Sequence, residues 1–165
     1  MTDSGIHIRP GRLADETALL DLLPRLAEFE LSPQRDPKDL WSSDAKLLSA
    51  VLRDEAPESF LLVAADAASD APAGCALVTL QGEFMSGTPG AHLQAIAVMP
   101  GYEGRGIGRR LLDAIEHEAR ARGARSMTLH VFTANERAHR LYEAVGYESE
   151  VQRCIKWLDE ETAHE

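Results

Sequence analysis

The chain has 165 residues, of which 44% are hydrophobic and 27% charged, as in one ordinary folded domain, so we predict a single domain over residues 1–165. Its formal net charge of −10 argues against nucleic-acid binding, which depends on Lys and Arg side chains that neutralise phosphates. No apolar run reaches the roughly 20 residues that span a bilayer, and no basic stretch followed by an apolar one opens the chain, so we predict a cytoplasmic protein that binds no membrane.

The first half of the chain alternates between strand and helix patterns. A short strand is predicted over residues 6–9 and a helix after a cap at Asp15, broken at Pro24. Asp44 is predicted to cap a second helix that ends before Pro57. Three strands follow, over residues 60–65, 75–80 and 92–98. The first two form a hairpin, because a turn-rich stretch separates them.

The second half contains two helices. A glycine-rich loop over residues 104–108 opens a helix with one apolar face, and a strand over residues 126–132 comes next. Asn135 caps the last helix, and a final strand is predicted over residues 151–158. We expect the polar end of the chain, residues 161–165, to be frayed. The whole order predicts one α/β (α+β) domain with a mixed sheet.

The loop over residues 104–108 has the composition of an anion site. Gly104, Gly106 and Gly108 let backbone N–H groups converge on a phosphate, and the helix that follows adds unpaired N–H donors and the positive end of its dipole. The motif lacks the Lys of a P-loop, and its G-x-G-x-G spacing differs from that of dinucleotide folds. Taken alone, these glycines also fit a flexible entry into a helix.

The neighbouring residues make the motif more specific. The strand that ends in Val98-Met99-Pro100, the glycine loop and the next helix together resemble the acetyl-CoA signature of the GNAT superfamily of N-acetyltransferases. Residues 135–147, which read NERAHRLYEAVGY, resemble its second signature. The resemblance implies the GNAT fold, a mixed central sheet with a splayed strand pair flanked by helices, and acetyl-CoA as cosubstrate.

The same resemblance implies roles for individual residues. The backbone of Ile96, Ala97 and Val98 would pair with the pantetheine arm. Asn135 would bind the pantetheine, and Tyr142 would protonate the leaving thiolate as general acid. Asn135 also fits a purely structural helix cap, and Tyr142 fits core packing. The pyrophosphate would rest on the amides of Gly104, Arg105, Gly106, Ile107, Gly108 and Arg109.

Two departures from the family pattern affect the chemistry. The loop carries Glu103 where relatives usually have Arg or Gln, and this departure affects cofactor affinity more than identity. Many relatives carry a Glu base on the strand before the loop, where this chain has Gln94. The remaining candidates are Glu83, then His92, whose imidazole suits the task, or no dedicated side-chain base at all. His130 is interpreted as structural.

The resemblance predicts a direct-transfer N-acetyltransferase acting on a primary amine of a small molecule. The sequence is also loosely similar to diamine acetyltransferases around Glu28 and Glu30, although two solvated glutamates explain that stretch equally well. A non-catalytic acyl-CoA-binding or regulatory module, or a protein N-terminal or lysine acetyltransferase, remains an alternative. A homodimer is expected, and no metal site, because Cys75 and Cys154 have no partner at metal-ligand spacing.

Overall fold

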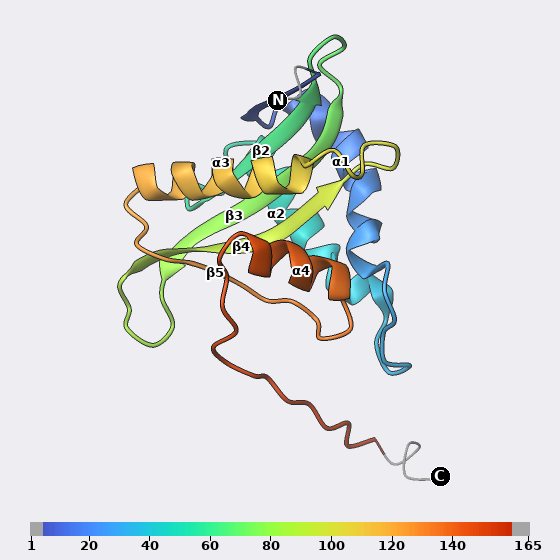
Figure 1. Ribbon diagram of the computed structural model, residues 1–165, viewed down its shortest axis with the longest axis vertical. Helices are drawn as coiled ribbons and strands as arrows, with labels where there is room; N and C mark the ends of the chain where they lie inside the picture. Colours follow the sequence, from blue (N-terminus) through green and yellow to red (C-terminus); the bar gives the residue numbers. More distant parts are fainter. Residues whose placement is uncertain (1–4, 160–165) are drawn as a thin grey trace.

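A five-stranded mixed sheet forms the centre of the computed structural model, which describes residues 5–159 (Figure 1). The first four strands are antiparallel to their neighbours, and β5 runs parallel to β4. This arrangement confirms the predicted mixed sheet. In spatial order the strands are β1 (Ile6–Pro10), β2 (Ser59–Asp66), β3 (Pro72–Gly82), β4 (Pro89–Val98) and β5 (Met127–Leu129).

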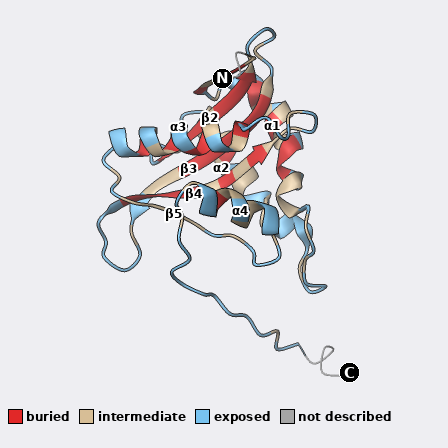
Figure 2. Ribbon diagram, in the orientation of Figure 1, coloured by how far each residue is buried: buried red, intermediate tan, exposed pale blue. Residues whose placement is uncertain are grey.

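Helices cover both faces of this sheet. Helices α1 (Glu16–Leu22) and α2 (Ser42–Leu52) pack on one face, and α3 (Ile107–Ala121) and α4 (Glu136–Ala144) pack on the other. Each face has its own apolar core, because side chains along a strand alternate between the two faces. In β2, for example, Leu61 and Val63 face α1 and α2, whereas Phe60 and Ala64 face α3. Figure 2 shows the buried residues along the sheet and the inner sides of the helices.

Neither of the two helix caps predicted before β2 is formed by its side chain. Pro24 ends the first helix as predicted, since α1 gives way to a 3₁₀ helix over Leu23–Ala27. The Asp15 side chain does not cap α1, because its buried carboxylate binds the Arg9 guanidinium at 2.7 and 2.9 Å. Asp44 does not cap α2 either, since the helix already begins at Ser42 and Asp44 lies in its first turn.

The predicted last strand does not form. Residues 147–159 have no regular secondary structure, and Figure 1 shows this segment running away from the sheet. Val151, Ile155 and Leu158 are exposed there. A period-two apolar pattern yields a strand only where a neighbouring strand completes the backbone hydrogen bonds, and this segment has none beside it. The strand predicted over 126–132 is likewise limited to β5, and residues 161–165 lie outside the described residues.

Candidate active site

Strand β4 loses its pairing with β5 halfway along its length. They pair only at Ala91–Met127, His92–Thr128 and Leu93–Leu129, and β4 then continues to Val98 without a partner on this side. The N–H of Met99 donates to Ala73 in β3, and in an antiparallel pair the hydrogen-bonding side alternates from residue to residue. The backbone groups of Ile96 and Val98 therefore face the gap. This geometry is the splayed strand pair that the sequence predicts.

A β-bulge lies where the two strands part. The register of β3 with β4 passes from Leu77–Ala95 to Val78–Leu93, which leaves Gln94 as the extra residue. Bulges bend a strand and change the direction of its side chains. Gln94, at the position where relatives carry a base, thus becomes part of the cleft wall.

The gap is the floor of a cleft of about 580 Å³ whose lining comes from both faces of the sheet. Two of the predicted site residues do not line it. The Arg105 guanidinium lies over the Tyr102 ring, 5.2 Å from its centroid, and Glu83 lies in the β3–β4 hairpin. The predicted residues that do line the cleft are Ile96, Ala97, Val98, Gly104, Gly106, Ile107, Gly108, Arg109, Asn135 and Tyr142.

The loop before α3 has an open backbone. Gly104 and Gly106 have φ values of 74° and 75°, in the left-handed region that favours glycine, and a Cβ at either position would meet no atom within 4 Å. Gly106 is the N-cap of α3, so the unpaired N–H groups of the first helical turn follow directly. Arg109 is exposed on the cleft and has no ion-pair partner among residues 5–159. These features fit a pyrophosphate group.

Glu103 does not leave an uncompensated charge in this loop. Its carboxylate accepts from the Arg25 guanidinium and lies 3.4 Å from Nη1 of Arg137. Arg25, followed by Arg137, lowers the pKa of Glu103. Arg25 also donates to the carbonyl oxygen of Val98, one of the groups that face the gap. Arg25 has no local sequence signal for this role, because nothing in its neighbourhood points to a partner 78 residues away.

Helix α4 contributes Asn135 and Tyr142 to the cleft. The Asn135 Oδ1 atom accepts from the N–H of Ala138 at 3.2 Å, so the capping role exists, and its amide N–H₂ has no partner among residues 5–159. Tyr142 is 9% exposed and packs in the core, with its ring 5.8 Å from that of Tyr147. Burial raises the pKa of Tyr142 to about 12. With this pKa the phenol keeps its proton at neutral pH. Its hydroxyl has no hydrogen-bond partner in the described chain.

The two predicted base candidates, Glu83 and His92, occupy different environments. The Glu83 carboxylate accepts from the N–H and Oγ of Ser86, both at 2.8 Å, and from the Met85 N–H, which lowers its pKa and holds it in the hairpin. His92 is buried, its Nδ1 2.8 Å from the Thr128 hydroxyl, and burial followed by His130 lowers its pKa. Neither lines the cleft. His130, interpreted as structural, does line it.

The wall on the α1 and α2 side contains residues that the sequence analysis did not assign to the site. Phe29, Leu40 and Asp44 line the cleft there. The Asp44 carboxylate is half-buried, and burial raises its pKa to about 6. Of the two glutamates proposed for the acceptor, Glu28 lines the cleft and pairs with Arg25 at 3.1 Å, whereas Glu30 is exposed and does not line it.

Comparison with known protein families agrees with the splayed strand pair and the glycine loop described above. A model of the acetyltransferase (GNAT) family matches residues 19–147. The chain belongs to the GNAT family of acetyltransferases. Over 111 residues it is 32% identical to an aminoglycoside N(6')-acetyltransferase type 1 of Stenotrophomonas maltophilia. The aligned region covers 66% of this chain and 70% of that protein. Family membership makes the chain an acyltransferase and confirms the resemblance of its two motifs.

Solved GNAT structures share the fold. AAC(6')-Iy in complex with a bisubstrate analogue, CoA-S-monomethyl-acetylneamine, superposes with a TM-score of 0.68 at 21% identity, over 94% of this chain and 99% of that one. A ribosomal-protein-alanine N-acetyltransferase from Brucella melitensis biovar Abortus 2308 gives 0.66 at 20% identity, over 93% and 99%. Identities this low establish the GNAT fold alone.

Other GNAT relatives match only locally. The chain is 39% identical over 61 residues to the mycothiol acetyltransferase of Propionibacterium freudenreichii and covers 20% of that protein's length. It covers 30% of an N-acetyltransferase of Bacillus subtilis, at 40% identity over 47 residues. The chain thus spans less than a third of these two curated relatives, whose substrates do not transfer to it directly.

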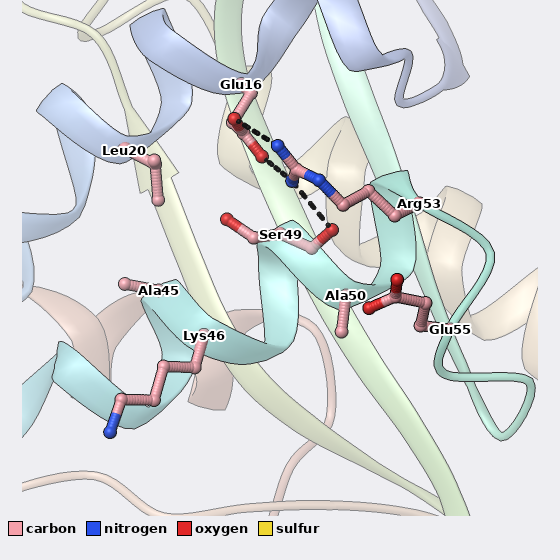
Figure 3. Close-up of a pocket in the computed structure, with 8 residues that line it drawn as sticks. All are labelled: Glu16, Leu20, Ala45, Lys46, Ser49, Ala50, Arg53 and Glu55. Carbon is pink, nitrogen blue, oxygen red and sulfur yellow. Dashed lines mark hydrogen bonds and ion pairs between the residues drawn. The ribbon is translucent and has the colours of Figure 1, made fainter.

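A second hollow lies outside the GNAT cleft, between α1 and α2 (Figure 3). An ion pair between Glu16 and Arg53 crosses it, and Ser49 and Lys46 lie on its rim. The pair lowers the pKa of Glu16. The charges of Glu16 and Arg53 match each other, so neither side chain is free to bind a charged ligand. Among residues 5–159, no cluster of His, Cys, Asp or Glu could hold a metal ion, and no helix is long and apolar enough to cross a membrane.

Proposed function

We propose that this chain transfers the acetyl group of acetyl-CoA directly to a primary amine of a small molecule. The observation that carries the proposal is the gap between β4 and β5, which is lined from both faces of the sheet. A cofactor can enter from the side of α3 and α4, and an acceptor from the side of α1 and α2. The two reactants then meet at the unpaired edge of β4, where proximity and alignment supply most of the rate gain.

The α3 and α4 side suits acetyl-CoA. The open loop and Arg109 would hold the pyrophosphate. The backbone groups of Ile96 and the N–H of Val98 face the gap and would pair with the pantetheine arm, whereas the Val98 carbonyl already accepts a hydrogen bond from Arg25. The unused amide N–H₂ of Asn135 is available to a pantetheine carbonyl. Acetyl-CoA supplies the activated acyl group. The backbone N–H groups at the gap would polarise the thioester carbonyl.

Direct transfer is the mechanism that these residues support. The amine attacks the thioester carbonyl, the C–S bond breaks, and the phenol of Tyr142 gives its proton to the departing thiolate. No acetyl-cysteine forms, because Cys75 is buried in β3 with a pKa raised to about 12 and Cys154 lies in the exposed C-terminal segment. The amine proton leaves to solvent in the open cleft, since Glu83 and His92 do not line it.

Free-thiol release from acetyl-CoA tests the proposal. Purified protein is assayed with a panel of diamines, amino sugars, amino acids and peptides with free N-termini or lysines, and the acetylated product is identified by mass spectrometry. Turnover of small amines is the expected result. Turnover confined to peptides would make the chain a protein acetyltransferase. Acetyl-CoA binding without turnover of any acceptor would make it a non-catalytic acyl-CoA-binding module. The homodimer and the cytoplasmic location stay predictions, the first testable by sedimentation velocity.

A further inference from the structure

Three carboxylates line the cleft, and two of them are already paired. Glu28 binds Arg25 at 3.1 Å, and Glu103 binds Arg25 and Arg137. Asp44 differs, because no residue between 5 and 159 donates a hydrogen bond or forms an ion pair with its carboxylate. Asp44 is therefore the acidic side chain of this cleft that is free to bind a cation.

The surroundings of Asp44 make an unpaired carboxylate costly. The side chain is half-buried in the first turn of α2, and the same wall of the cleft contains Phe29 and Leu40. The Phe29 ring lies 5.2 Å from that of Phe132, a second aromatic side chain in the lining. Removal of water from a charge without a partner is unfavourable, and here the burial alone accounts for the raised pKa of Asp44. An organic cation would offset that cost, and aromatic faces favour cations. The Phe132 ring already carries one, the Arg35 guanidinium 5.6 Å from its centroid, so Phe29 is the aromatic side chain of this wall that remains for a ligand.

The position of Asp44 determines which part of a substrate it can meet. Asp44 lies on the α1 and α2 side of the sheet, whereas Gly106 and Asn135 lie on the α3 and α4 side. If acetyl-CoA binds on the latter side, Asp44 faces the acceptor. A carboxylate stabilises the protonated form of a bound amine, but the attacking amine has to be neutral. Asp44 is thus suited to an ammonium group of the acceptor other than the one that is acetylated.

We propose that Asp44, with Phe29 of the same wall, binds a second, non-reacting ammonium group of the acceptor, so that the preferred substrates are amines with at least two cationic groups. This inference rests on the proposed function and narrows its substrate class. It also replaces Glu28 and Glu30 as the recognition residues, since Glu28 is already paired and Glu30 lies outside the cleft.

The test compares a diamine with a monoamine of the same length. The kcat/KM values of 1,4-diaminobutane and 1-aminobutane are measured by thiol release for the wild type, for Asp44→Asn and for a matched control, Asp39→Asn. Asp39 is exposed, outside the cleft and close in sequence, so its substitution removes the same charge without touching the site. Asp44→Asn should lower kcat/KM for the diamine roughly 10- to 100-fold, as expected for a lost contact between charged groups, and change it less than about twofold for the monoamine.

The diamine-to-monoamine ratio should stay at the wild-type value in Asp39→Asn. An unchanged ratio in Asp44→Asn would overturn the assignment while leaving the acetyltransferase proposal intact. Calorimetric titration of 1,4-diaminobutane into the CoA-loaded protein gives a readout that needs no turnover. If the wild type acetylates no amine, the proposed function fails, and an equal Kd in the wild type and Asp44→Asn would still overturn the cation site. Asp44→Ser serves as a second variant if Asp44→Asn does not fold.

Discussion

The guanidinium of Arg25 joins the two walls of the cleft by binding the carboxylate of Glu103 in the loop before α3. The same guanidinium donates to the carbonyl of Val98 at the end of β4. An acid next to a phosphate site would repel the ligand, and Arg25 removes that repulsion. Glu103, the residue by which this loop departs from the family pattern, is thus paired with a cation from the opposite side of the sheet.

Arg25→Ala should weaken acetyl-CoA binding because it leaves Glu103 with Arg137 as its remaining partner. For an exposed pair we expect the Kd to rise by no more than about fivefold, and by less at high salt. The double variant Arg25→Ala/Glu103→Gln should recover most of the loss. Calorimetric Kd values at two salt concentrations provide the measurement. A double variant as weak as Arg25→Ala would mean that Arg25 acts through Val98 rather than through Glu103.

Gly106→Val should abolish the stabilisation of the protein by acetyl-CoA. In the wild type, ligand at 100 times its Kd contributes about 2.7 kcal/mol, a melting shift of roughly 5–11 °C for a domain of this size. A branched side chain at Gly106 would occupy the open space above the loop. Gly123→Val is the matched control, because Gly123 also has a positive φ and open surroundings but follows the far end of α3. If acetyl-CoA raised the melting temperature of Gly106→Val as much as that of the wild type, the phosphates would bind elsewhere.

Tyr142→Phe should lower kcat about 10²-fold and leave the affinity for acetyl-CoA nearly unchanged. The hydroxyl has no hydrogen-bond partner in the described chain, so its removal should cost little stability. Because the pKa of Tyr142 is raised to about 12, the wild-type rate should show no alkaline limb from this group below pH 10. The kcat is measured across pH for both proteins where chemistry limits the rate. Equal values would leave Tyr142 with a packing role alone.

Two substitutions separate the two roles of Asn135. Asn135→Ser keeps a good helix cap but removes the amide N–H₂ group that could reach the pantetheine, whereas Asn135→Ala removes both. If Asn135 binds the cofactor, both variants should raise the KM for acetyl-CoA, and Asn135→Ala alone should also lower the melting temperature. A wild-type KM for acetyl-CoA in Asn135→Ser would mean that Asn135 serves only as a helix cap.

Asp44→Asn should stabilise the free protein at neutral pH. The carboxyl group has a pKa of 3.8 when unfolded and about 6 when folded, so between these values the native state holds more protons. The free energy of unfolding of the wild type therefore falls as pH rises from about 4 to about 6, by at most about 3 kcal/mol for a shift of about two units. Asn does not titrate and avoids this loss. Urea unfolding of both proteins at pH 4 and pH 7.5 measures the difference, and a less stable Asp44→Asn at pH 7.5 would contradict it.

Much of the fold was predictable from the sequence by itself, as was the meeting of most of the proposed cofactor residues along one cleft. The apolar stripe of α3 and the glycines at 104 and 106 are local signals, because helix periodicity and positive φ depend on a few consecutive residues. The splayed strands and the roles proposed for Asn135 and Tyr142 come from the resemblance of two continuous motifs. Those residues lie close together in sequence and face one cleft, so their arrangement changes little with the rest of the chain.

Only the tertiary structure shows which side chains line the α1 and α2 side of the cleft and how its charges pair. Glu83 looked close to the site in sequence, but it closes the β3–β4 hairpin outside the cleft. Asp44 was predicted to cap a helix, but α2 begins at Ser42 and contains Asp44 in its first turn. Arg25 and Glu103 meet across 78 residues, and residues 151–158 have the pattern of a strand but no neighbouring strand. Each of these outcomes depends on a partner brought near by folding, since burial, ion pairing and strand pairing are properties of two surfaces in contact and not of one segment.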